Sequence, residues 1–148
     1  MSFSLLLIGL SLALFAYWFR YSCLLILRTQ TAEDYAGAVS RANGLSFNLV
    51  KGQIETEANA NLDLLYSSLE RDYRIVSQLL DQVPAGPQDE NILQTKLLRA
   101  NFKVTQIWFR VSRAVGLPAS ANALEEMADM ISHFANNFGE YSASKSAA

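Results

Sequence analysis

Residues 93–114 read LQTKLLRANFKVTQIWFRVSRA, and apolar side chains recur in this stretch at alternating steps of four and three residues. Seven positions form this first apolar row: Leu93, Leu97, Ala100, Val104, Ile107, Val111 and Ala114. The spacing places them on one face of an α-helix, because a helix turns by about 100° per residue. Gly116 and Pro118 follow and are typical of a helix end. The stretch therefore predicts a long helix whose first apolar row faces the core.

The same stretch has a second apolar row on roughly the opposite side of the predicted helix, formed by Leu98, Phe102 and Phe109. A helix in a two-layer core needs only one such row. Either two short helices earlier in the chain cover the second row, or it meets another protein or the bilayer surface. Aromatic side chains ringed by arginine are typical of interface centres. The sequence thus proposes a candidate partner interface of Leu98, Phe102, Phe109 and Arg110.

Basic side chains fill much of the space between the two rows: Arg99, Lys103, Arg110 and Arg113. In contrast, the charged side chains of residues 117–144 are all acidic: Glu125, Glu126, Asp129 and Glu140. An acidic last helix packed beside the basic one would account for the basic residues without a ligand. Solvent-exposed pairs of opposite charge on neighbouring helices are common and contribute little to stability. Anionic lipid headgroups are the alternative for a basic face held near a membrane.

Helical patterns continue on both sides of this stretch. Two short helices are predicted, one starting at Thr31 and ending at Asn43, and one capped by Ser46 over residues 46–54. A long helix follows over residues 60–83, up to the break at residues 84–87.

The last helix is predicted from Asn122 to Gly139, and the Ser/Ala-rich residues 140–148 are predicted to form a disordered tail. The pattern shows no strand-like alternation. It predicts an all-α chain: an N-terminal transmembrane helix (residues 1–28), a short helical connector with a helix-turn-helix-like corner (29–58), and an antiparallel three-helix bundle (59–139).

The N-terminal prediction rests on Met1 to Phe19, which contain no charged side chain. The 17 residues from Phe3 to Phe19 span about 26 Å as a helix, just enough for a hydrocarbon core. A cleaved signal peptide fits poorly, because no basic residue precedes the apolar run and large aromatic residues stand where a cleavage site needs small ones. The sequence therefore predicts an uncleaved anchor.

Aromatic and basic side chains mark the end of this span, and the candidate membrane-boundary residues are Trp18, Arg20, Tyr21 and Arg28. Alternatively the span runs from Leu6 to Leu27 and Arg20 meets a partner subunit inside the bilayer. Positive residues follow the span and none precedes it. The positive-inside tendency then predicts a single-pass protein of the cell (inner) membrane, with its N-terminus outside and its C-terminal domain in the cytoplasm.

Net charge and motifs restrict the chemistry of the rest of the chain. Residues 29–148 carry ten basic and fourteen acidic side chains, a poor composition for nucleic-acid binding. The stretch from Val39 to Gly52 resembles a helix-turn-helix in its spacing, but its second helix offers only one cation, Lys51. Glu126, Asp129 and His133 share a helix face, yet the chain has a single histidine and a single cysteine, Cys23. No cofactor, metal or catalytic site is predicted.

The sequence-based hypothesis is therefore a non-catalytic membrane accessory or scaffold subunit. Its cytoplasmic helical bundle would dock on a larger membrane complex or a partner protein, with the lipid bilayer as the other partner. A membrane-tethered regulator that reads DNA through residues 39–52 is the first alternative. An interfacial enzyme that uses Glu126, Asp129 or His133 for proton transfer is the second.

Overall fold

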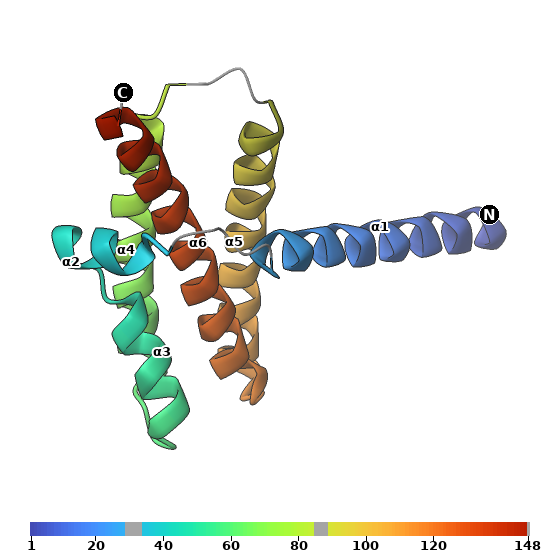
Figure 1. The fold of residues 1–148 in the computed structure, drawn as a ribbon. Helices are drawn as coiled ribbons and strands as arrows, with labels where there is room; N and C mark the ends of the chain where they lie inside the picture. Colours follow the sequence, from blue (N-terminus) through green and yellow to red (C-terminus); the bar gives the residue numbers. More distant parts are fainter. Residues whose placement is uncertain (29–33, 85–88, 148) are drawn as a thin grey trace. The chain divides into compact units, whose positions relative to one another are not determined.

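The structure, a computed structural model, describes residues 1–28, 34–84 and 89–147, and within them all regular structure is helical (Figure 1). The helices are α1 (Ser2–Arg28), α2 (Ala36–Asn43), α3 (Phe47–Thr56), α4 (Leu62–Asp81), α5 (Asp89–Val115) and α6 (Ala119–Ala147). This confirms the predicted all-α class with one long apolar N-terminal helix. The predicted start of the first short helix, Thr31, lies outside the described residues.

The chain divides into two compact units, Met1–Gln30 and Thr31–Ala148. The first unit contains α1. The second contains α2 to α6, so the short helices and the three long ones belong to one packed body. Within it α4, α5 and α6 run alternately up and down, as short connections between neighbouring helices favour (Figure 1).

The core of the second unit is built around α6, against which α2, α3, α4 and α5 all pack. Buried residues recur along nearly the whole helix: Ala123, Leu124, Met127, Ala128, Met130, Ile131, Phe134, Ala135 and Gly139. They include pairs of neighbours, so the apolar surface extends around much of the helix rather than along one face. Such a helix is stable only when it is covered on several sides.

The α2–α3 corner is fixed by a buried carboxylate from α4. Gly44 ends α2 with a positive φ of 62°, a backbone conformation that glycine adopts without strain. Asp72, which is fully buried, accepts a hydrogen bond of 2.5 Å from the backbone N–H of Ser46, the residue before α3. Arg71 bonds both Asp72 and the Ser46 hydroxyl. The prediction that the Ser46 side chain caps α3 is therefore wrong. Ser46 instead attaches the corner to α4.

The predicted disordered tail is wrong for residues 140–147, because α6 continues through Gly139 to Ala147. Alanine is a strong helix former, and the Ser144 and Ser146 hydroxyls donate to backbone carbonyls one turn earlier, so the composition is compatible with a helix. Gly139 does not end the helix; it allows close packing. A Cβ at position 139 would overlap the Cβ of Tyr35, which immediately precedes α2.

We expect Gly139→Ala to lower the free energy of unfolding by about 1–3 kcal/mol, because the added methyl group must push Tyr35 and α2 away from α6. Gly37→Ala is the matched control: position 37 is in α2 with no atom within 4 Å of an added Cβ, so this change should stabilise by about 0.4–1 kcal/mol. Urea unfolding of the full chain in detergent, followed by circular dichroism, compares the two. Equal effects of the same sign would contradict the packing described.

Candidate functional site

The second apolar row of α5 lies in the core. Leu98 and Phe102 are 0% exposed and Phe109 is 3% exposed. The ring of Phe102 stacks on Tyr73 of α4 with a centroid distance of 3.9 Å, and Phe109 stacks on Tyr66 with a distance of 4.7 Å. The predicted partner interface is therefore wrong for these three residues, since the chain itself covers them. The covering side chains identified by these contacts come from α4 and not from the two short helices.

The first apolar row of α5, predicted to face the core, is largely at the surface. Leu93, Val104, Ile107 and Val111 are between 47% and 63% exposed, and the alanines of the row, Ala100 and Ala114, are exposed as well. Trp108 and Val115 extend the same surface. The prediction that this row faces the core is therefore wrong, and the exposed apolar surface of α5 is the candidate docking surface of the second unit.

Buried polar residues on α5 explain why the row predicted to face the core lies at the surface while the second row lies in the core. Asn101, Thr105 and Ser112 stand beside the aromatic row and suggest a solvated face, yet all three are buried. The Thr105 hydroxyl donates to the carbonyl of Asn101 at 2.9 Å, and the Ser112 hydroxyl donates to that of Phe109 at 3.0 Å. Hydroxyls that bond to the helix's own backbone are buried at little cost. The large aromatic rings then decide which row fills the core.

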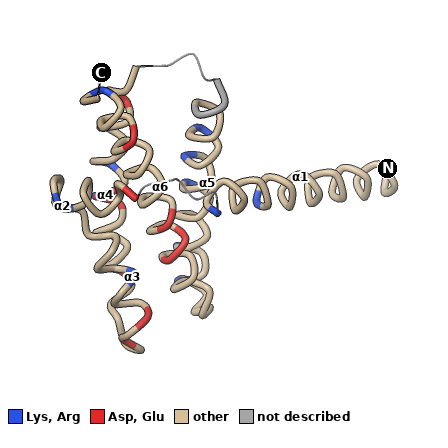
Figure 2. The backbone as a smooth tube through the Cα atoms, in the orientation of Figure 1, with Lys and Arg blue, Asp and Glu red and all other residues tan. Residues whose placement is uncertain are grey.

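Two of the predicted basic residues on α5 pair with α4. Basic residues lie along α5 and acidic ones along α6 (Figure 2). However, Arg99 contacts Asp81 at 2.8 Å and Arg113 contacts Asp63 at 2.7 Å, so the expectation that the acidic last helix neutralises these two residues is wrong. The hydrogen bond from Arg113 lowers the pKa of Asp63. Both pairs lie at the surface and contribute little to stability.

Lys103 and Arg110 lie over aromatic rings instead. The Lys103 ammonium is 5.3 Å from the ring centre of Tyr73, and the Arg110 guanidinium is 5.7 Å from that of Tyr66. Cation–π contacts of this kind hold a basic side chain against the surface without neutralising its charge. Lys96, Lys103 and Arg110 recur at intervals of seven residues and are all exposed, so they form a basic row along one edge of the docking surface.

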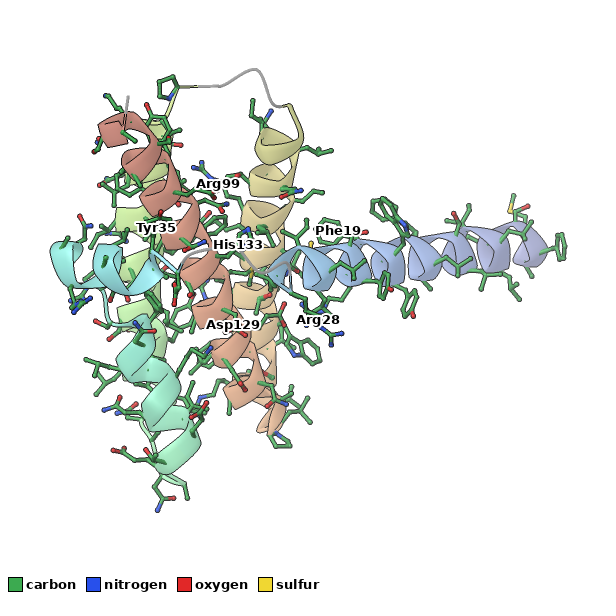
Figure 3. All side chains as sticks on the ribbon, in the orientation of Figure 1. Phe19, Arg28, Tyr35, Arg99, Asp129 and His133 are labelled. Carbon is green, nitrogen blue, oxygen red and sulfur yellow. The ribbon has the colours of Figure 1, made fainter. Side chains whose placement is uncertain are left out.

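The acidic and histidine side chains of α6 engage different neighbours. Asp129 accepts from Lys51 of α3 at 2.5 Å, and Glu126 accepts from the amide of Asn101 at 3.1 Å. His133 is partly buried, and its Nε2 finds no hydrogen-bond partner among the described residues (Figure 3). Within the described part of the chain, no three side chains of the metal-binding types come together. Glu126 is thus engaged by α5 and Asp129 by α3.

The helix-turn-helix-like corner uses its residues for packing. Leu45, Phe47 and Val50 are buried, and Lys51, the cation on which DNA binding would depend, is paired with Asp129. Leu49, another apolar residue of α3, is exposed. The corner is thus held to α4 by the bond between Ser46 and Asp72 and to α6 by the pair of Lys51 and Asp129.

In the first unit, α1 is one unbroken helix of 27 residues, about 40 Å long, and its mean hydropathy reaches 1.9 over 18 residues. It is long and apolar enough to cross a membrane. Trp18 and Tyr21 are exposed side chains on this helix, and the ring of Tyr21 stacks on Tyr17 one turn earlier. Arg20 interrupts the apolar run without interrupting the helix. Arg28 is its last residue, so the four predicted boundary residues all lie in its C-terminal half.

Comparison with known proteins identifies no relative: no family model matches the chain, and neither does any curated protein or solved structure.

Sequence reasoning overlooked two features. Trp108 was not recognised as part of an exposed surface, although it adjoins the first apolar row in the sequence pattern. Asp72 was not recognised as a buried residue. The neighbouring Arg71 gave no indication of this burial, because an Arg-Asp pair in a helix is ordinary. The contact that buries Asp72 is with Ser46, which lies 26 positions away in the sequence.

His133 should make stability dependent on pH. Burial lowers its pKa below the ordinary value of 6.5, so the folded state favours the neutral imidazole. As the pH falls through 6.5, the unfolded chain takes up a proton that the folded chain binds less well, and the free energy of unfolding decreases. Above about pH 7.5 this contribution is constant.

Urea midpoints of the wild-type chain and of His133→Gln, measured across this pH range, test the assignment. The wild type should lose stability more steeply below pH 6.5 than the variant. Parallel curves would show that His133 titrates alike in both states.

Proposed function

We propose that this protein is a single-pass membrane accessory or scaffold subunit. In this proposal α1 spans the cell (inner) membrane, the second unit is cytoplasmic, and it docks on a partner protein of a membrane complex through the exposed apolar surface of α5. The single observation that carries the docking step is the exposure of the first apolar row. A continuous apolar surface along one helix is typical of an interaction site, whereas scattered exposed apolar residues are not.

The opposite face of α5 supports the same proposal. Its second apolar row is already covered by α4 and α6, so the exposed row is not needed for folding of the second unit. The flanking Trp108, Lys103 and Arg110 are residue types enriched in, or commonly found around, interfaces. The exposed row can therefore be changed without opening the core, which makes the proposal testable.

Membrane attachment is supported by the length and hydropathy of α1. The orientation rests on Arg20 and Arg28, which follow the apolar run while no basic side chain precedes it. Anionic lipid headgroups remain a second partner for the basic row. The DNA-reading alternative has less support, because Lys51 is engaged by Asp129. The enzyme alternative has less support as well, since Glu126 and Asp129 are engaged by Asn101 and Lys51.

The anchor proposal predicts that the full chain stays with membranes after an alkaline carbonate wash, while a chain lacking residues 1–28 is released. Protease added outside intact cells should leave the second unit intact, and protease added to inverted vesicles should digest it. The N-terminus of the membrane-bound protein should still contain residues before Cys23. A mature chain that begins after Cys23, or one that is dissolved without detergent, contradicts the proposal.

The docking proposal predicts that Ile107→Asp reduces the native mass of the assembly extracted in mild detergent, because a charge replaces an apolar contact. Leu64→Asp is the matched control, since Leu64 is 65% exposed on α4, outside the docking surface. Native electrophoresis and mass photometry measure the effect, and circular dichroism checks that both variants fold. Equal masses for wild type and Ile107→Asp would mean that the first apolar row is not an interface.

A further inference from the structure

The first apolar row of α5 has the repeat of a coiled coil. Its steps of four and three residues average 3.5, and seven such positions follow one another without interruption. This is the spacing at which two helices keep a common apolar contact line. In heptad notation the a positions are Leu97, Val104 and Val111, and the d positions are Leu93, Ala100, Ile107 and Ala114. At about 100° per residue, the row is centred opposite the face that carries Phe102 and Phe109.

We propose that the occupant of this surface is α5 of a second copy of the chain, packed parallel and in register. This inference rests on the proposed docking function and names its partner. Because the row lies opposite the core face, two second units can meet along α5 with their α4 and α6 helices directed away from the contact.

The residue types on the row fit a pair of helices. Val104 and Val111 occupy two of the three a positions, where β-branched residues favour two-stranded parallel coiled coils. Ala100 and Ala114 occupy two of the four d positions, and their small side chains let the two backbones approach closely.

The two edges of the row differ in charge. One edge, the g positions, carries the basic row Lys96, Lys103 and Arg110 and lies on the side of α4, where the neighbouring Arg99 pairs with Asp81. The other edge, the e positions, lies on the side of α6: Asn101 donates to Glu126 there, and Trp108 and Val115 follow along it.

This asymmetry selects the parallel arrangement. An antiparallel pair would place one basic edge against the other, and like charges repel. A parallel pair places the basic edge of one copy against the e edge of its partner, five residues further along. Lys96 then comes close to Glu126 of the second copy, and Lys103 comes close to the ring of Trp108. An anionic bilayer suits the surface less well, because Glu126 borders it on the α6 side.

Cysteine scanning of the full chain in detergent tests the inference, with Cys23→Ser removing the single native thiol. Leu97→Cys, Val104→Cys and Val111→Cys are made one at a time. Identical a positions face each other along the whole length of a parallel, in-register pair, and so come within disulfide reach. Leu64→Cys on α4 is the control. Differently tagged copies report whether the cross-linked species contains two copies of this chain.

Disulfide-linked pairs at all three a positions, with little at position 64, support the inference. Lys96→Glu should raise the dissociation constant of the pair about two- to five-fold, and adding Glu126→Lys should restore the original affinity. Cross-linking at one of the three positions indicates an antiparallel or shifted contact and overturns the inference.

Two further outcomes separate this inference from the proposed function. If the tagged copies do not co-purify, yet Ile107→Asp still removes a different protein from the assembly, the second copy is excluded and the docking function stands. If the full chain is a monomer in detergent and Ile107→Asp removes no other protein from the assembly, both proposals are overturned.

Discussion

Burial of α6 on several sides is the constraint on which the second unit depends. Each large apolar side chain removed from water contributes about 1.5–3 kcal/mol, and α6 buries Leu124, Met127, Met130, Ile131 and Phe134 completely. No single neighbour can cover side chains that point in so many directions. The other four helices of the unit are therefore arranged around α6, and the short α2 and α3 contribute to the core although neither is long enough to be stable alone.

The sequence predicts the helices of this chain better than it predicts their contacts. Gly116 ends α5 with a φ of 74°, as its position after the periodic stretch indicates. Local signals of this kind are physical properties of one or two residues. The continuation of α6 beyond Gly139 was not predictable in the same way, because a glycine that ends a helix and a glycine that admits a neighbouring chain look alike in the sequence.

The assignment of the two faces of α5 shows a second limit. Regular spacing identifies both apolar rows, but it does not say which one is buried. That choice depends on Tyr66 and Tyr73 in another helix, which stack on the aromatic residues of the second row. It also depends on Thr105, whose hydroxyl is satisfied by its own backbone. The candidate docking surface consequently follows from tertiary structure, although every residue in it is visible in the sequence pattern.

The attachment of Tyr35 to α6 has a mechanical consequence. The backbone N–H of Tyr35 donates to the side chain of Asn136 at 2.6 Å, and the Tyr35 side chain lies against Gly139, so the residue before α2 (labelled in Figure 3) is fastened to α6 itself. A force applied to the chain at Tyr35 would therefore act first on the central helix of the unit. The hydrogen bond and the close contact at Tyr35 would then resist that force.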